Sequence, residues 1–258
     1  MNDIFNISRF GRLFKKHTAE YYKSYFMSLT VLIGVLVLGG AFLTFIIPDG
    51  HIDVQFQSVI YVIIMPLAGT MFTSTIFGAY GNKNKAIASL TLPASHFEKY
   101  MVAWLYSSVI FVAVFTVTFY LILLFLFSLK HLPGQTLAVF NIFHTPVGYQ
   151  VFLLFALLHS IAFYGAILFE KLHFIKTAFA FFIAMAAMVI FNKILLSVLF
   201  GRDVVASPPF TNARFNEKSE GISISVISTQ ESQMLIVIAV LTIIFWTAAY
   251  YRLKEKQV

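Results

Sequence analysis

The chain has 258 residues, of which 59% are hydrophobic and only 11% are charged, and its mean hydropathy is +0.85. A soluble globule of this size needs more polar residues to cover its surface, so the composition excludes that class and indicates an integral membrane protein. The formal net charge is +7, and the absence of cysteine excludes disulfides, thiolate metal sites and cysteine nucleophiles.

Residues 1–25 predict a basic amphipathic helix that lies in the membrane interface. At 100° per residue, apolar side chains gather on one half of this helix and basic side chains on the other. The basic residues are Arg9, Arg12, Lys15 and Lys16. A positively charged flank that only fixes the orientation of the chain is the alternative interpretation.

Residues 26–258 predict an all-α polytopic domain with six transmembrane helices. Each of six apolar segments is long enough to cross a bilayer core of about 30 Å as a helix. The segments are Phe26–Ile47, Phe56–Ala79, Met101–Ser128, Tyr149–Phe169, Phe174–Phe200 and Met234–Tyr250. Six crossings place both termini on the same side of the membrane.

The distribution of basic residues predicts which side that is. With both termini in the cytoplasm, the inner segments hold 13 Lys and Arg, the outer loops hold 4, and Lys193 falls inside a span. The positive-inside rule therefore favours cytoplasmic termini.

The polar stretch 81–100 lies on the predicted inner side, between the second and third spans. Residues 86–92 predict a short helix, and Pro93 disfavours the helical conformation in the residue before it. Ser95 and Glu98 then have the spacing of a capping box, which predicts that a new helix begins here and runs into the third span.

The predicted outer loop 201–233 is the largest in the chain. The alternation in Ile222–Val226 is compatible with a strand, and short helices that dip back toward the membrane are equally compatible with the loop.

A stripe of small residues runs along the second span. Its members recur at helical spacing and predict a surface that another helix can approach closely, either within the monomer or at a dimer or pathway face. They are Thr70, Thr73, Ser74 and Gly78.

His159 lies near the middle of the fourth span, where an ionisable residue is a candidate pathway residue. Glu170 follows 11 residues later, which corresponds to about 16 Å along a helix, so the two side chains cannot share one metal or one proton. A neutral, hydrogen-bonded interior histidine is the favoured interpretation.

The order of these features resembles the permease subunit of ABC-2-type (type V exporter-like) transporters. The resemblance is carried by Ser89–Ser95 (SLTLPAS) followed by Glu98-Lys99, together with a basic amphipathic first helix and a long outer loop before the last span. It implies an exporter permease of the bacterial cytoplasmic membrane that forms the translocation pathway as a homodimer, or as a heterodimer with a similar permease.

The resemblance also implies a division of labour between subunits. A separate ATP-binding cassette subunit would bind ATP and Mg, while this chain, which has no GxxxxGK[ST] sequence, would be non-catalytic and carry no cofactor. The segment that resembles the family's coupling helix and its cap comprises Lys83, Lys85, Ala86, Ile87, Leu90, Leu92, Pro93, Ser95 and Glu98.

Other functions are compatible with six spans. A secondary transporter or a membrane assembly or immunity factor is the main alternative, although no Asp or Glu lies well inside a span to carry ion coupling. A polytopic membrane enzyme is disfavoured because the nucleotide-binding, zinc-binding and serine-hydrolase motifs are all absent from the sequence.

Overall fold

A computed structural model describes most of the chain. The described residues are 5–46, 53–76, 94–129, 138–143, 146–169, 171–209, 211, 213–214, 223–224 and 228–255. Most of the predicted coupling segment, from Lys83 to Pro93, lies outside the described residues. The same is true of Gly78 and Glu170.

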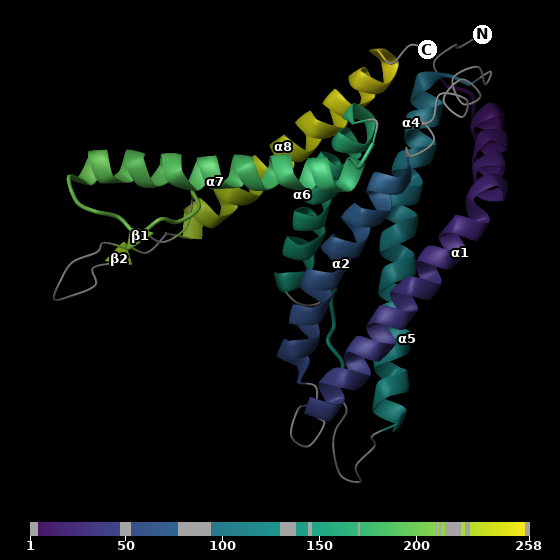
Figure 1. Ribbon diagram of the computed structural model, residues 1–258, viewed down its shortest axis with the longest axis horizontal. Helices are drawn as coiled ribbons and strands as arrows, with labels where there is room; N and C mark the ends of the chain where they lie inside the picture. The colour runs from purple at the N-terminus through teal and green to yellow at the C-terminus, as the bar shows by residue number, and fades with distance from the viewer. Residues whose placement is uncertain are drawn as a thin grey trace.

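Long helices dominate the described residues (Figure 1). They are α1 (Ile7–Ile46), α2 (Val54–Ile76), α4 (His96–Leu105), the π-helix η3 (Tyr106–Ile110), α5 (Phe111–Leu129), α6 (Pro146–Leu168), α7 (His173–Phe200) and α8 (Ser228–Glu255). Since α4, η3 and α5 follow one another without a break, the described residues contain six helical segments that are long and apolar enough to cross a membrane. This confirms the prediction of a multi-pass helical chain.

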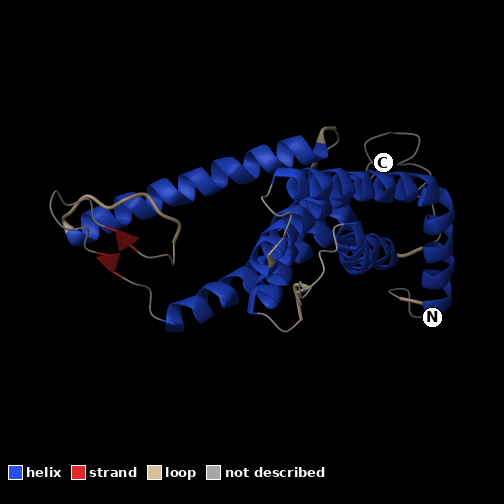
Figure 2. Ribbon diagram, turned by 90° about the horizontal axis from the view of Figure 1, so that it is seen from below, coloured by secondary structure: helices blue, strands red, loops and turns tan. Residues whose placement is uncertain are grey.

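The first helix is longer than predicted. Residues 7–46 form one continuous helix, so the boundary expected near residue 25 is not a break in the hydrogen-bonded backbone. Figures 1 and 2 show that α1 is bent, and its N-terminal part runs in a different direction from the rest. The location of this first part in the membrane interface stays a prediction.

The helices α1, α2 and α5 run beside one another, and α6 packs against α2 and α8 (Figure 1). The starts of α1 and α4 and the end of α8 lie toward one end of the molecule, while the end of α1 and the start of α2 lie toward the other. The directions of α1, α2 and α5 agree with an alternating passage of this part of the chain between two sides.

The helix α7 departs from a simple bundle because it runs across the direction of α2 and α5 (Figures 1 and 2). It crosses α6 where Gly165 meets Thr177, and a Cβ atom added to Gly165 would lie 1.9 Å from Thr177 Oγ1. Most of its apolar side chains are exposed, for example Phe182 at 67% and Val198 at 78%. The protein itself therefore buries little of α7.

The predicted outer loop contains a short antiparallel pair of strands, β1 (Ala213–Arg214) and β2 (Ser223–Ile224). Ala213 pairs with Ile224, and Arg214 pairs with Ser223. The strand β2 falls inside the alternating stretch Ile222–Val226. Of the two predicted alternatives, a strand or a short helix, the strand is therefore the one found at Ser223–Ile224.

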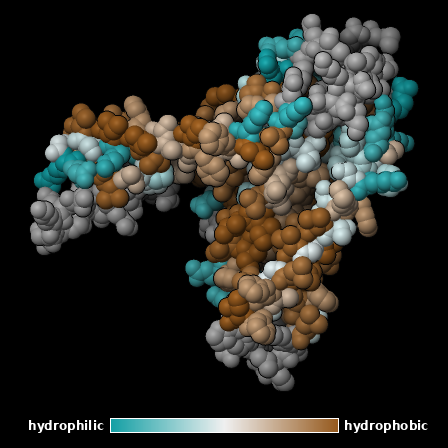
Figure 3. Space-filling model, viewed as in Figure 1, coloured by the Kyte–Doolittle hydropathy of each residue, from teal (hydrophilic) through white to brown (hydrophobic). Residues whose placement is uncertain are grey.

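Two hydrophobic clusters fill the interior. One surrounds Tyr61, Phe115 and Phe119 between α2 and α5, and the other surrounds Tyr100, Tyr106 and Phe163 near the starts of α1 and α4. On the face shown in Figure 3, hydrophobic residues cover the middle of the bundle and hydrophilic residues gather near the termini, as expected where a membrane-embedded region meets a polar end.

Candidate functional site

The start of α4 has the predicted capping box. Ser95 Oγ accepts a hydrogen bond from Glu98 N at 3.1 Å, and Glu98 Oε2 accepts one from Ser95 N at 3.0 Å. These bonds satisfy backbone N–H groups that have no partner within the helix. The local sequence is therefore sufficient to fix where α4 begins.

Glu98 also binds the start of α1. Its Oε1 accepts from Asn6 N at 2.8 Å, and Arg9 Nε donates to Oε1 and Oε2 at 2.9 and 2.8 Å. Asn6 in turn caps α1, because its Oδ1 accepts from the backbone N–H groups of Ser8 and Arg9. One fully buried carboxylate thus joins the N-terminal ends of two helices, where the helix dipoles favour a negative charge.

The apolar face of the first part of α1 lies partly against protein. Phe10, Leu13 and Phe14 pack on the cluster around Tyr106, and the Phe14 ring stacks on the Tyr106 ring at 4.8 Å. The predicted interfacial face is consequently covered in part by α4 and η3. The basic side chains predicted on the other face divide, since Arg12, Lys15 and Lys16 are exposed whereas Arg9 pairs with Glu98.

The π-helix η3 makes three consecutive residues face different partners. The Tyr106 hydroxyl bonds with Thr18 Oγ1 on α1, Ser107 Oγ bonds with His159 Nε2 on α6 at 2.8 Å, and Ser108 Oγ donates to Trp104 O at 2.6 Å. Single-turn π-helices inside α-helices are frequent at functional sites. No pattern in the sequence of residues 106–110 predicts η3.

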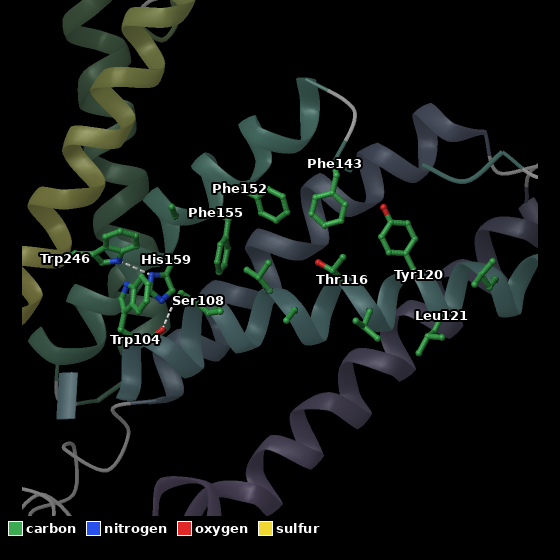
Figure 4. Close-up of a pocket in the computed structure, with 16 residues that line it drawn as sticks. Trp104, Ser108, Thr116, Tyr120, Leu121, Phe143, Phe152, Phe155, His159 and Trp246 are labelled. Atoms are coloured by element: carbon green, nitrogen blue, oxygen red, sulfur yellow. Dashed lines mark hydrogen bonds between the residues drawn. The ribbon is translucent and has the colours of Figure 1, made fainter. Parts of the chain in front are cut away.

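His159 is fully buried with both ring nitrogens occupied. Its Nδ1 accepts from Trp246 Nε1 at 3.1 Å (Figure 4), and since an indole N–H only donates, Nδ1 carries no proton. The neutral ring therefore donates from Nε2 to Ser107 Oγ, whose hydroxyl donates to Ala103 O at 2.8 Å. This geometry is that of a hydrogen-bonded interior histidine joining α6 to η3 and α8.

A large apolar pocket lies beside His159, between α5, α6 and α8 (Figure 4). Its volume is about 830 Å³. The side chains that line it are Trp104, Ser108, Val109, Val112, Ala113, Thr116, Val117, Tyr120, Leu121, Leu124, Phe143, Phe152, Phe155, Ala156, His159 and Trp246. A pocket of this size and polarity suits an apolar ligand.

The small-residue stripe of α2 faces α6 in part. A Cβ atom added to Gly69 would lie 2.3 Å from Phe155 Cε2, and the neighbouring Thr73 and Ser74 are buried. Their hydroxyls, like that of Thr70, donate to carbonyls of the same helix. These described members of the stripe contribute to helix packing within one chain.

The described residues contain no group of three His, Cys, Asp or Glu side chains that could hold a metal ion. No family model, curated protein or solved structure matches the chain.

Proposed function

We propose that this chain is the membrane-spanning permease subunit of an ATP-driven exporter of the ABC-2 type. It would work as a dimer, with ATP and Mg bound by separate ATP-binding subunits on the cytoplasmic side of a bacterial inner membrane. The proposal derives from the family resemblance around residues 89–99 and is compatible with six apolar helical segments.

The observation that carries the proposal is the attachment of Glu98 to both helix starts. A coupling segment must transmit movement to the spans, and a loose hinge directly after it would absorb that movement. The capping box and the bonds from Asn6 and Arg9 instead hold the starts of α4 and α1 together. A displacement of residues 86–92 would therefore move both helices.

The same run of helix leads from Glu98 to the pocket. After α4, η3 binds α1 through Tyr106 and His159 through Ser107, and α5 then forms one wall of the pocket. A shift of α4 along its axis would change these contacts and the shape of the pocket. In this mechanism His159 is a positioning residue, because both of its ring nitrogens are bonded to protein groups.

The proposal is tested by co-expressing the chain with a candidate ATP-binding subunit. The double variant Ile87→Asp, Leu90→Asp replaces the two predicted apolar anchors. We expect it to lose co-purification with the ATP-binding subunit, because burying a charge in place of a docked apolar side chain has a large desolvation cost. Val205→Asp, at an exposed residue of the predicted outer loop, is the matched control. Unchanged co-purification and ATP turnover in the double variant would refute the assignment.

A further inference from the structure

We propose that the pocket beside His159 holds one extended aliphatic chain of a membrane lipid, which enters sideways from the bilayer. The inference requires only that the helices are in a membrane, so it stands independently of any ATP-binding partner. Its basis is the length, the volume and the chemistry of the pocket.

The pocket is long and follows the helix axis. The residues that line it on α4, η3 and α5 extend from Trp104 to Leu124, recurring every three or four positions along one face. Twenty residues at a rise of 1.5 Å each correspond to about 30 Å. This length matches the hydrocarbon core of a bilayer, which is about 30 Å thick.

The volume of the pocket also suits a thin occupant. A space of about 830 Å³ that extends over about 30 Å can hold a single extended hydrocarbon chain.

Several polar groups in the wall already have partners. The Thr116 hydroxyl bonds with Tyr61 OH at 2.8 Å, Tyr120 OH donates to Phe140 O at 2.8 Å, and Ser108 Oγ donates to Trp104 O. His159 is bonded at both nitrogens. A polar ligand would lose its hydration here and gain few hydrogen bonds, so the wall favours a purely aliphatic segment.

The pocket opens toward the outside of the bundle. Val109, Val117 and Leu121 line it and are 50%, 60% and 61% exposed. On the opposite wall, the rings of Phe143, Phe152 and Phe155 follow one another (Figure 4). A lipid chain can thus lie between an aromatic wall and α5 while its headgroup stays in the interface.

Photochemical labelling tests this assignment. The purified chain is placed in phosphatidylcholine vesicles that contain a phosphatidylcholine with a diazirine in one acyl chain, and the labelled peptides are mapped after irradiation. We expect preferential labelling of residues 109–121 and a severalfold decrease in Ala113→Phe, whose ring fills the middle of the pocket. Ala184→Phe, at an exposed alanine of α7, is the matched control and should leave that labelling unchanged. Equal labelling of the pocket in both variants would overturn the proposal.

A second measurement needs no bulky substitution. The only two tryptophans, Trp104 and Trp246, both line the pocket, so vesicles with brominated acyl chains should quench the wild-type fluorescence. Absence of quenching would contradict the proposal.

Because the chain has no cysteine, Val117→Cys also reports on a protein occupant. A disulfide-linked dimer of Val117→Cys would show that a second copy covers the pocket, which would likewise overturn the assignment.

Discussion

Arg9 and Glu98 form an ion pair that joins two helix starts 89 positions apart in the sequence, with Arg9 Nε 2.8 Å from Glu98 Oε2. The carboxylate is fully buried, whereas the Arg9 side chain is 29% exposed. The hydrogen bonds from Asn6, Arg9 and Ser95 to this carboxylate all come from N–H groups. The site is therefore matched to an acceptor-only, charged side chain.

Replacing Glu98 by Gln is expected to destabilise the protein by about 1–3 kcal/mol, because the amide N–H₂ of Gln would face a backbone N–H donor and the charge that attracts Arg9 would be lost. Thermal unfolding in detergent micelles measures the change. Glu20→Gln is the control. Glu20 pairs with Lys16 and its side chain is 53% exposed, so this substitution should change the stability by no more than about 0.5 kcal/mol. Equal effects of the two substitutions would contradict a structural role for the buried pair.

The crossing of α6 and α7 depends on a glycine. In Gly165→Ala the new methyl group would meet not only Thr177 Oγ1 but also Thr177 Cβ at 2.8 Å, which no rotation of the side chain can move away. We expect a loss of about 1–2 kcal/mol, because overpacking outweighs the gain in helix propensity. Gly39→Ala in α1 has nothing within 4 Å and should be neutral or slightly stabilising in the same unfolding measurement. A stable Gly165→Ala protein would show that α7 does not cross α6 this closely.

The hydrogen bond between His159 and Trp246 should appear as an energetic coupling. His159→Phe, Trp246→Phe and the double variant form a cycle in which we expect a coupling of about 1 kcal/mol, because either single change leaves the other residue without its bond. The control cycle combines Trp104→Phe with His159→Phe. Trp104 contacts Trp246 edge to face, whereas the hydrogen bond to His159 comes from Trp246. Strict additivity in the first cycle would contradict the bond.

The predicted orientation can be measured with single cysteines, which the sequence permits because it contains none. Val205→Cys in the outer loop should react with a membrane-impermeant thiol reagent in intact cells. Lys171→Cys, between α6 and α7, should react only after the membrane is permeabilised, because the positive-inside rule places it in the cytoplasm. Both residues are exposed, so the reverse pattern would overturn the orientation.

Features set by neighbouring residues were predictable from the sequence. The capping box needs only Ser95 and Glu98 three positions apart, and the length of the spans follows from hydrophobicity alone. The favoured interpretation of His159 as an interior, hydrogen-bonded residue agrees with its two bonds.

Features set by distant residues were not predictable. Nothing in the spacing of Arg9 and Glu98, or of His159 and Trp246, indicates that they meet, since each contact depends on how two helices pack. The direction of α7 was equally hidden, because an apolar helix has the same composition at any angle to its neighbours.

The most direct test of the proposed function is a crosslink from the predicted coupling segment to an ATP-binding subunit. Leu90→Cys, modified with a photoreactive maleimide in membranes that contain both subunits, is predicted to give a covalent product with the ATP-binding subunit, while Val205→Cys gives none. A functional complex in which Leu90→Cys forms no such product, or in which both positions react equally, would contradict the account.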